Sequence, residues 1–485
     1  MLLLCILLPL FSGILIYLIQ PRSTRILMGG TLAVTILTSV LCWICILQGT
    51  DHTQPLIRFA PNLELLLSMD GLGKFFVGLI ATLWPLTVLY AFSYMKEEHH
   101  LRMFFGFFTL AYSATLGVAM AGNLFTMYCF YELLTLSTVP LIMQPMTKAA
   151  LRATRQYFLY SVGGAAFAFA AMMFLIANNA AGPFRMGGVL IGHPYGNDDI
   201  IRLFWLFGFL GFGVKAALFP VYKWLPNASV APTPVTALLH AVAVVKAGSF
   251  AVIRLTYYCF GTEILKGSWA QTTAIALTAF TIVFGSVFAL KETNFKRRLA
   301  YSTVANMSYI VFGAVLLIPS GLEASLMHMA AHACIKILAF FAAGAVLHQS
   351  GKESIYELDG LGRKMPVTFA CYTVAAIALT GIPPFSGFVS KWYLLTGAAE
   401  AGGIAYIGAA AILISALLTA VYTLTVARRA WFPDKNADLS GLDSIKEADW
   451  KMLVPMLIFA AGTLLCGIFS QPILDAATAI ARGLT

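Results

Sequence analysis

Charged residues are scarce in this 485-residue sequence, where Asp, Glu, Lys and Arg together make up 11% of the chain. A soluble domain of similar length carries about 25% charged residues. In addition, 60% of the residues are hydrophobic, and apolar runs long enough to span a bilayer recur from one end to the other. The composition therefore excludes an ordinary soluble protein and indicates an all-α polytopic membrane protein.

Motifs for redox cofactors are also missing, since no haem, iron–sulfur or flavin pattern occurs in the sequence. The eight cysteines all fall within apolar runs. Cys42 and Cys45 have the spacing of a redox motif, but they lie in a continuous apolar stretch without further ligands, which favours ordinary packing. The net charge of +10 is scattered among short loops, and this argues against nucleic acid as a partner. We expect no cofactor and no metal.

Fourteen apolar spans are expected, all within a single membrane domain of residues 1–485. The first run lacks a positive N-terminal region and a small-residue cleavage site, so it is interpreted as a retained span rather than a signal peptide. The spans are expected near residues 2–19, 26–48, 72–93, 103–121, 123–146, 157–177, 201–221, 233–257, 270–290, 300–318, 322–347, 367–395, 403–427 and 451–472.

The distribution of Lys and Arg predicts the orientation of these spans. Loops after odd-numbered spans hold 20 of the 31 basic residues, and the opposite side holds seven. Cytoplasmic loops carry the excess of positive charge, so both termini are expected outside the cytoplasm, in a plasma-membrane protein. The remaining four basic residues are lysines that lie inside spans: Lys215, Lys246, Lys336 and Lys391.

Two segments five spans apart share the pattern G-F-x-x-K, at 211–215 and at 387–391. Both stand beside proline-rich breaks, and segments five spans apart run in opposite directions across the membrane. This arrangement predicts an inverted repeat: helices 4–8 (101–257) against helices 9–13 (258–430), preceded by helices 1–3 (1–100) and followed by 431–485. Helix breaks are expected at Pro220, Pro232, Pro234, Pro383 and Pro384.

Glu132 is the one acidic residue in the middle of an apolar span. A charge at this depth costs several kcal/mol, so an ionisable residue there is a functional hypothesis. We expect the Glu132 carboxylate to pair with a lysine and to change its partner or protonation during transport. The alternative is a structural carboxyl group that is satisfied by a nearby hydroxyl, from Thr135 or Ser137.

Lysine rather than arginine occupies all four sites inside the spans. Arginine does not deprotonate in proteins, whereas a buried lysine can take up and release a proton. We therefore predict that Lys215 and Lys391 transfer protons. The alternative is that their side chains extend to the headgroups at a helix end.

Three residues recur at steps of four: His328, His332 and Lys336. This spacing places them along one helix face, and a neutral imidazole can accept a proton on one nitrogen and donate one from the other. A proton relay is favoured over a metal site, since the segment holds no third ligand. His240 and Lys246 are six residues apart and are expected to link neighbouring parts of one path. Lys296, Arg297 and Arg298 are expected to form a cytoplasmic anchor, and Asp70 a helix cap.

Five segments that contain these residues together resemble a known family: 212–226, 231–248, 296–310, 328–341 and 381–392. They are similar to the antiporter-like subunits of respiratory complex I, of Mrp-type cation/proton antiporters and of energy-converting membrane-bound hydrogenases. The form of the segment 227–232, with the following LLHAVAVVKAG, looks nearest to the Mrp D-type and hydrogenase-type members. Tyr222 departs from the pattern, because histidine is common there.

The resemblance implies fourteen core helices, two inverted five-helix repeats and discontinuous helices 7 and 12. It also implies that Glu132 and Lys215 are partners, that Lys246, His328, His332 and Lys336 form the central relay, and that Lys391 is the terminal lysine. The expected partners are other membrane subunits of a multisubunit complex, including a neighbouring antiporter-like or small membrane subunit, together with protons and the lipid bilayer.

Three functions compete at this point. The first is proton translocation as a subunit of a redox-driven or Mrp-type complex, in which this chain is a non-redox part of an oxidoreductase and holds no cofactor. The second is Na⁺/H⁺ antiport with no redox partner, although only one deep carboxylate is present as an oxygen ligand. The third is a redox subunit that binds quinone, which the missing cofactor motifs disfavour.

Overall fold

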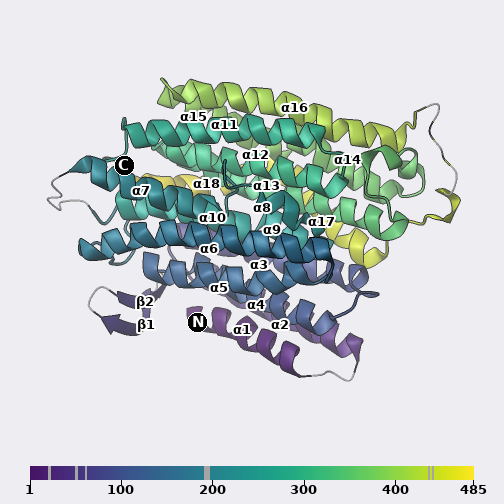
Figure 1. Ribbon diagram of the computed structural model, residues 1–485, viewed down its shortest axis with the longest axis horizontal. Coiled ribbons are helices and arrows are strands. Elements are labelled where there is room, and N and C mark those ends of the chain that lie inside the picture. The colour runs from purple at the N-terminus through teal and green to yellow at the C-terminus, as the bar shows by residue number, and fades with distance from the viewer. Residues whose placement is uncertain are drawn as a thin grey trace.

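The computed structural model describes residues 1–19, 23–49, 53–60, 63–190, 197–434, 437, 439 and 442–484. The helices run side by side in one bundle, and a small hairpin lies at one end (Figure 1). The hairpin pairs β1 (Thr53–Ala60) with β2 (Leu63–Ser68) in antiparallel register. An entirely α-helical chain was therefore a wrong expectation, since two strands form within the long loop that follows the second helix.

Within the described residues, ten helical stretches are long and apolar enough to cross a membrane. They are α2 (Thr24–Leu47), α3 (Gly71–Tyr94), α4 (Leu101–Ala119), α5 (Leu124–Met143), α6 (Lys148–Ala177), the stretch Thr233–Phe260, α11 (Trp269–Lys291), α13 (Pro319–Ser350), α16 (Ala405–Trp431) and α17 (Trp450–Ile468). The other α-helices are α1 (Leu2–Leu18), α7 (Asp198–Gly213), α8 (Trp224–Asn227), α12 (Phe295–Val315), α14 (Pro366–Thr380), α15 (Ser386–Ala401) and α18 (Gln471–Ala481).

Two helical stretches are interrupted beside the proline residues that the sequence singled out. α7 ends at Gly213, and helix resumes at Trp224 after a segment of turns that contains Pro220. α14 ends at Thr380, and α15 begins at Ser386 after Pro383 and Pro384. Proline lacks the N–H that a helix interior needs, and its ring clashes with the preceding turn.

A third interruption lies where the sequence predicted one continuous span, 233–257. Two residues separate α9 (Thr233–Ala241) from α10 (Val244–Ile253), and α10 continues into the π-helix η2 (Arg254–Phe260). Pro232 and Pro234 do not interrupt a helix. They stand at the N-cap and in the first turn of α9, where a missing N–H is tolerated.

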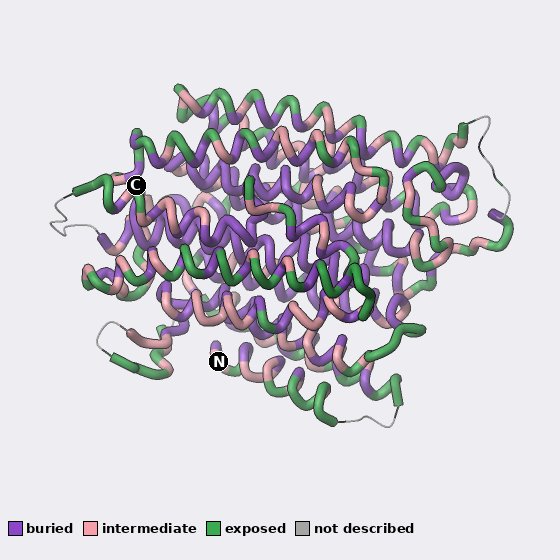
Figure 2. Tube along the Cα trace, in the orientation of Figure 1, coloured by how far each residue is buried: buried purple, intermediate pink, exposed green. Residues whose placement is uncertain are grey.

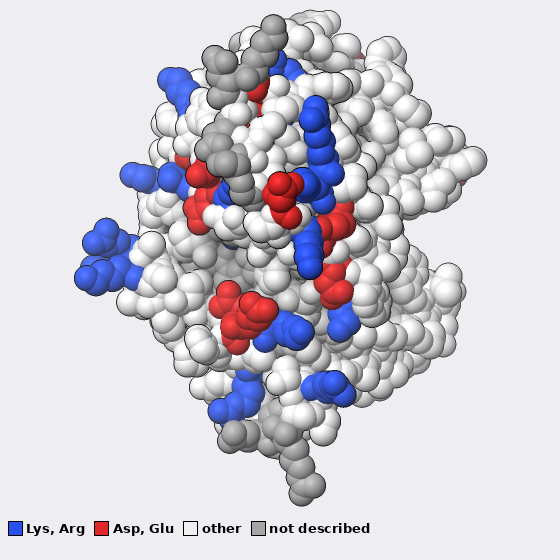
Figure 3. Space-filling model, turned by 90° about the vertical axis from the view of Figure 1, so that its right-hand side faces the viewer, with Lys and Arg blue, Asp and Glu red and all other residues white. Residues whose placement is uncertain are grey.

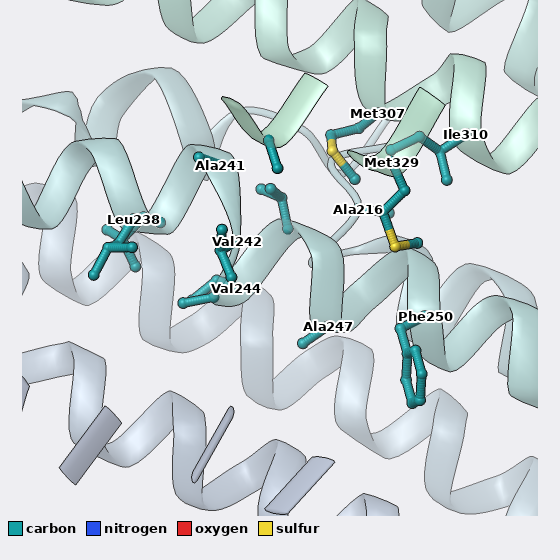
Figure 4. Packing of buried hydrophobic residues seen from close by; sticks show 14 of the residues in the cluster. Ala216, Leu238, Ala241, Val242, Val244, Ala247, Phe250, Met307, Ile310 and Met329 are labelled. Carbon is teal, nitrogen blue, oxygen red and sulfur yellow. The ribbon is translucent and has the colours of Figure 1, made fainter. Parts of the chain in front are cut away.

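The most buried part of the bundle is the stretch Thr233–Phe260 together with α13. Buried residues fill the middle of the molecule, and exposed ones cover the outer helices (Figure 2). Around the gap between α9 and α10, Ala241, Val242 and Val244 belong to the buried core, which also includes Met307 of α12 and Met329 of α13 (Figure 4). The gap is therefore enclosed by protein rather than by lipid.

One partly buried ion pair fixes the start of α3 to the end of this central stretch. Asp70 is the N-cap of α3, as expected, and its carboxylate also accepts two hydrogen bonds of 2.5 Å from the Arg254 guanidinium of η2. Burial favours the neutral carboxyl group, but the charge and hydrogen bonds of Arg254 outweigh this effect and hold the pKa of Asp70 below its usual range. The sequence predicted the helix cap at Asp70 but not the ion pair between Asp70 and Arg254.

We expect Asp70→Asn to lower the melting temperature (Tm) of the purified protein at neutral pH, by an amount equivalent to roughly 3 kcal/mol, because Arg254 would stay buried without a counter-charge. A folded-state pKa that is depressed gives stability that is complete above about pH 4 and is lost as the pH falls through the folded pKa. The wild type and Asp70→Asn should therefore converge in acid. The exposed Asp475→Asn serves as the control, and equal Tm values for all three proteins at pH 7 would contradict a stabilising pair.

Candidate functional site

The lysines and histidines selected from the sequence are buried inside the bundle. Lys215, His240, Lys246, His328, His332, Lys336 and Lys391 are each at most 6% exposed. Of the described ion pairs, none involves these four lysines. Their ammonium groups instead contact backbone carbonyls or an imidazole, as described below.

Lys246 and His332 form the central contact of the site. The Lys246 Nζ of α10 lies 2.6 Å from Nδ1 of His332 on α13. Either the ammonium donates to a neutral imidazole, or a neutral amine accepts from the ring N–H, so the two groups can share one proton. The sequence placed both residues on one path, and the structure brings their side chains into contact.

His328 extends the polar line along α13 toward α15. Its ring centroid lies 5.9 Å from that of His332, and its Nδ1 lies 3.0 Å from the Ser390 hydroxyl. The Ser390 hydroxyl can also donate to the Gly387 carbonyl at 3.2 Å. In that arrangement it accepts from the Nδ1–H of His328, and Nε2 of His328 is left able to accept a proton.

Lys391 follows Ser390 on α15 and lies against the end of α14. Its ammonium donates to the carbonyls of Leu379 and Thr380 at 2.7 and 2.9 Å. These carbonyls belong to the last turn of α14, where the helix dipole favours a positive charge. The break at Pro383 and Pro384 thus provides the partners of Lys391.

Lys336 and His240 lie beside this line. Lys336 donates to the Leu299 carbonyl of α12 at 3.0 Å. The His240 ring of α9 lies 4.7 Å from the Phe340 ring of α13, and its two nitrogens are buried without a hydrogen-bond partner. His328, His332 and Lys336 share one helix, as their spacing predicted, but each contacts a different neighbouring element.

Glu132 and Lys215 lie close in the fold but form no ion pair within 4 Å. The Lys215 ammonium donates to the Tyr131 carbonyl at 2.5 Å and lies 3.4 Å from the centre of the Tyr131 ring. Oε1 of Glu132 is buried without a partner. The hydroxyls of Thr135 and Ser137 are directed to backbone carbonyls, so the structural alternative for Glu132 has no hydroxyl partner either.

Unpartnered polar atoms recur along the elements that carry these residues. Buried polar groups normally have hydrogen-bond partners, and sites where several do not are typical positions for bound water. The atoms are Ser229 Oγ, Thr233 Oγ1, both His240 nitrogens, His328 Nε2, His332 Nε2 and Ser386 Oγ. Ser229 precedes α9, Thr233 and His240 lie on α9, and the other atoms lie on α13 and at the start of α15, between Lys246 and Lys391.

A cavity of about 410 Å³ opens beside the start of α9. Ser229, Pro232, Lys296 and Glu353 are among its lining residues. It lies at the end of the bundle that carries the loops after odd-numbered spans, and the opposite end carries the hairpin and both termini (Figure 1). Lys and Arg side chains, interspersed with Asp and Glu, are scattered over the cavity's end of the molecule (Figure 3).

The expected cytoplasmic anchor at residues 296–298 is a wrong expectation for two of its three members. Lys296 is directed inward and donates to the Ala231 carbonyl at 2.7 Å. Arg298 is buried and donates to the carbonyls of Leu290, Glu292 and Tyr422. Only Arg297 has the exposed side chain that an anchor requires. Three consecutive basic residues predict an exposed surface segment, and their spacing does not indicate which side chains are directed into the protein.

Sequence reasoning also missed Ser390, the hydroxyl partner of His328. A signal was present, because the two G-F-x-x-K segments differ at the position before the lysine. Ser390 occupies that position in the second segment, where the first has Val214. Tyr222, which departs from the family pattern, packs its ring against Phe219 and Phe284 instead of contacting the central residues.

The chain is similar to known membrane proteins along its whole length. The sequence profile described as "NADH:quinone oxidoreductase/Mrp antiporter, TM" matches residues 121–419. NADH-quinone oxidoreductase subunit N of Desulforudis audaxviator is 30% identical over 97% of this chain and 96% of its own length. A Na⁺/H⁺ antiporter subunit of Bacillus subtilis is 26% identical over 96% of this chain and 93% of its own length.

The fold is shared with solved structures. A chain of the membrane-bound sulfane sulfur reductase, an archaeal respiratory membrane complex, superposes with a TM-score of 0.87 at 24% identity. The match covers 100% of this chain and 97% of that chain. The helical bundle of this chain therefore has the same fold as that membrane-complex chain.

We expect Lys336→Met to maintain or raise the Tm of the purified protein, because each buried ion costs several kcal/mol to desolvate and methionine has a similar length. The Leu299 carbonyl would keep the Thr303 hydroxyl as a donor. Leu338→Ala, at a buried apolar position on the same helix, is the control and should lose about 2–5 kcal/mol. Destabilisation of Lys336→Met to the level of Leu338→Ala would show that Lys336 has a structural role.

Proposed function

Because the chain belongs to the NADH:quinone oxidoreductase/Mrp antiporter transmembrane family, we propose that it translocates protons across the membrane as an antiporter-like subunit of a larger complex. The contact between Lys246 and His332 carries this proposal. A lysine and a histidine that share one proton inside a membrane bundle, with no described carboxylate within 4 Å of the lysine, are suited to moving that proton rather than to fixing a charge.

Protons enter at the cavity beside the start of α9 and reach His240 past the unpartnered hydroxyls of Ser229 and Thr233. From His240 they pass by way of Lys336 to Lys246, and then through His332 and His328 to Lys391. The unpartnered atoms along α9 and α13 support this route, because water bound there would connect the side chains. Lys296 lies at the mouth of the route and holds the Ala231 carbonyl next to α9.

Lys215 and Glu132 form the coupling element of this chain. Lys215 rests on the carbonyl of the residue that precedes Glu132, so a small shift of α5 or of the segment after α7 would move the ammonium toward the carboxylate. Formation and loss of that ion pair would change the charge next to the relay. This arrangement would link proton movement here to a neighbouring membrane subunit.

The finer architecture belongs to the same proposal. Counting the interrupted stretches α7–α8, α9–α10 and α14–α15 as one span each gives fourteen spans for α1 to α17, in the order that the sequence predicted. The breaks after α7 and α14 stand in corresponding positions of two inverted five-helix repeats, 101–257 and 258–430. The end of the bundle that holds the cavity faces the cytoplasm of the plasma membrane, and both termini face outward.

Na⁺/H⁺ antiport is the second candidate, since a relative of similar length is a Na⁺/H⁺ antiporter subunit. The two candidates share the proton path and differ in whether Na⁺ drives it. Proton flux that depends on Na⁺ in vesicles without any redox substrate would favour the second candidate. Flux that depends on a redox substrate and is indifferent to Na⁺ would favour the first.

We expect Lys215→Ala to abolish proton pumping by the assembled complex, since the coupling charge would be lost. The measurement is acidification or alkalinisation of vesicles that contain the complex, with subunit assembly checked on the same preparation. Lys266→Ala removes an exposed lysine and is the matched control, which should pump normally. Normal pumping by a fully assembled Lys215→Ala complex would refute the role given to Lys215.

A further inference from the structure

A narrow apolar groove lies on the outer side of the bundle, between α6 and the segment after α7. Its volume is about 450 Å³. Leu159, Gly163 and Phe167 of α6 line one wall, and Pro220 and Val221 line the other. The three α6 residues are exposed and stand four positions apart, so they share one helix face that is directed away from the protein core.

The same face of α6 becomes basic at the end of the helix near the cavity mouth. Arg155 precedes Leu159 by one turn, and Arg152 and Lys148 continue the face by steps of three and four. Lys223 follows Val221 on the opposite wall. All four side chains belong to exposed residues, and no described carboxylate lies within 4 Å of any of them. The groove thus has an apolar body and an unpaired positive rim.

The dimensions of the groove decide what can occupy it. A helix with side chains is about 10–12 Å across, so three turns of helix occupy more than 1,000 Å³ by a rough cylinder estimate. A groove of about 450 Å³ is too small to enclose such a helix, which could only pack across its opening. An extended hydrocarbon chain is much thinner, and basic residues beside grooves between membrane helices attract anionic lipid headgroups.

We propose that this groove binds one acyl chain of an anionic phospholipid, whose phosphate is held by Arg152 and Arg155. The lipid would lie directly against the break that positions Lys215, since Val214 lines the groove and Pro220 belongs to the same turn segment. Gly164, next to Gly163, packs so closely on Val214 that an added Cβ would lie 2.6 Å from it. The lipid would therefore contact α6 and the break together and support their packing.

Gly163 provides a sharp test because a Cβ added there would meet no atom within 4 Å. Gly163→Leu fills the groove without disturbing the core. Gly30→Leu is the matched control, because Gly30 is also exposed and helical, with no atom within 4 Å of an added Cβ, but lies on α2. A third variant, Arg152→Gln with Arg155→Gln, removes the positive rim and leaves the groove open.

The experiment titrates the purified full-length chain in detergent with phosphatidylglycerol or phosphatidylcholine and counts bound lipids by native mass spectrometry. The wild type and Gly30→Leu are expected to retain one phosphatidylglycerol at least tenfold more tightly than phosphatidylcholine. Gly163→Leu should lose that lipid. The double Arg variant should bind both lipids equally, and inorganic phosphate should not compete.

Three results would overturn the proposal. Unchanged phosphatidylglycerol binding by Gly163→Leu would place the lipid elsewhere on the protein. Equal binding of both lipids by the wild type would remove the role of the arginines. Crosslinking of the groove to a helix of another subunit in the assembled complex, with no lipid retained, would assign this face to a protein partner and would likewise refute the lipid site.

Discussion

The structure depends on the burial of ammonium groups without carboxylate partners. Lys215, Lys336 and Lys391 donate to backbone carbonyls, and Lys246 contacts an imidazole. A carboxylate would lock a lysine in its charged form, whereas a carbonyl accepts a hydrogen bond from both the ammonium and the neutral amine. The carbonyl hydrogen bond offsets part of the desolvation free energy of the buried ammonium group, and the lysine can still lose its proton. A proton relay requires this property.

One of the broken helices, α14–α15, supplies carbonyl partners to a buried lysine. Carbonyls inside an intact helix are occupied by the helix itself, but carbonyls in a last turn are not. Lys391 donates to two such free carbonyls in the last turn of α14. The gap between α9 and α10 separates His240 from Lys246 and leaves both near α13. The break after α14 therefore provides the partners of Lys391, whereas Lys215 and Lys336 donate to carbonyls inside the unbroken helices α5 and α12.

Much of the site could be predicted from the residue types and their spacing. The step of four along α13 placed His328, His332 and Lys336 on one helix, and prolines marked the breaks after α7 and α14. The gap at residues 242–243 could not be predicted, because the alternating Ala and Val residues there contain neither proline nor glycine. The inward direction of Lys296 and the separation of Glu132 from Lys215 depend on tertiary packing, which a residue pattern does not specify.

His332 joins the two halves of the proposed path, since it contacts Lys246 on one side and lies beside His328 on the other. The most direct test is proton pumping by the assembled complex that carries His332→Leu. This substitution removes both ring nitrogens and leaves an apolar side chain of similar size. If a continuous relay runs through α13, the variant should lose proton pumping while its assembly and Tm are retained. Pumping at the wild-type rate in that variant would contradict a continuous relay through α13.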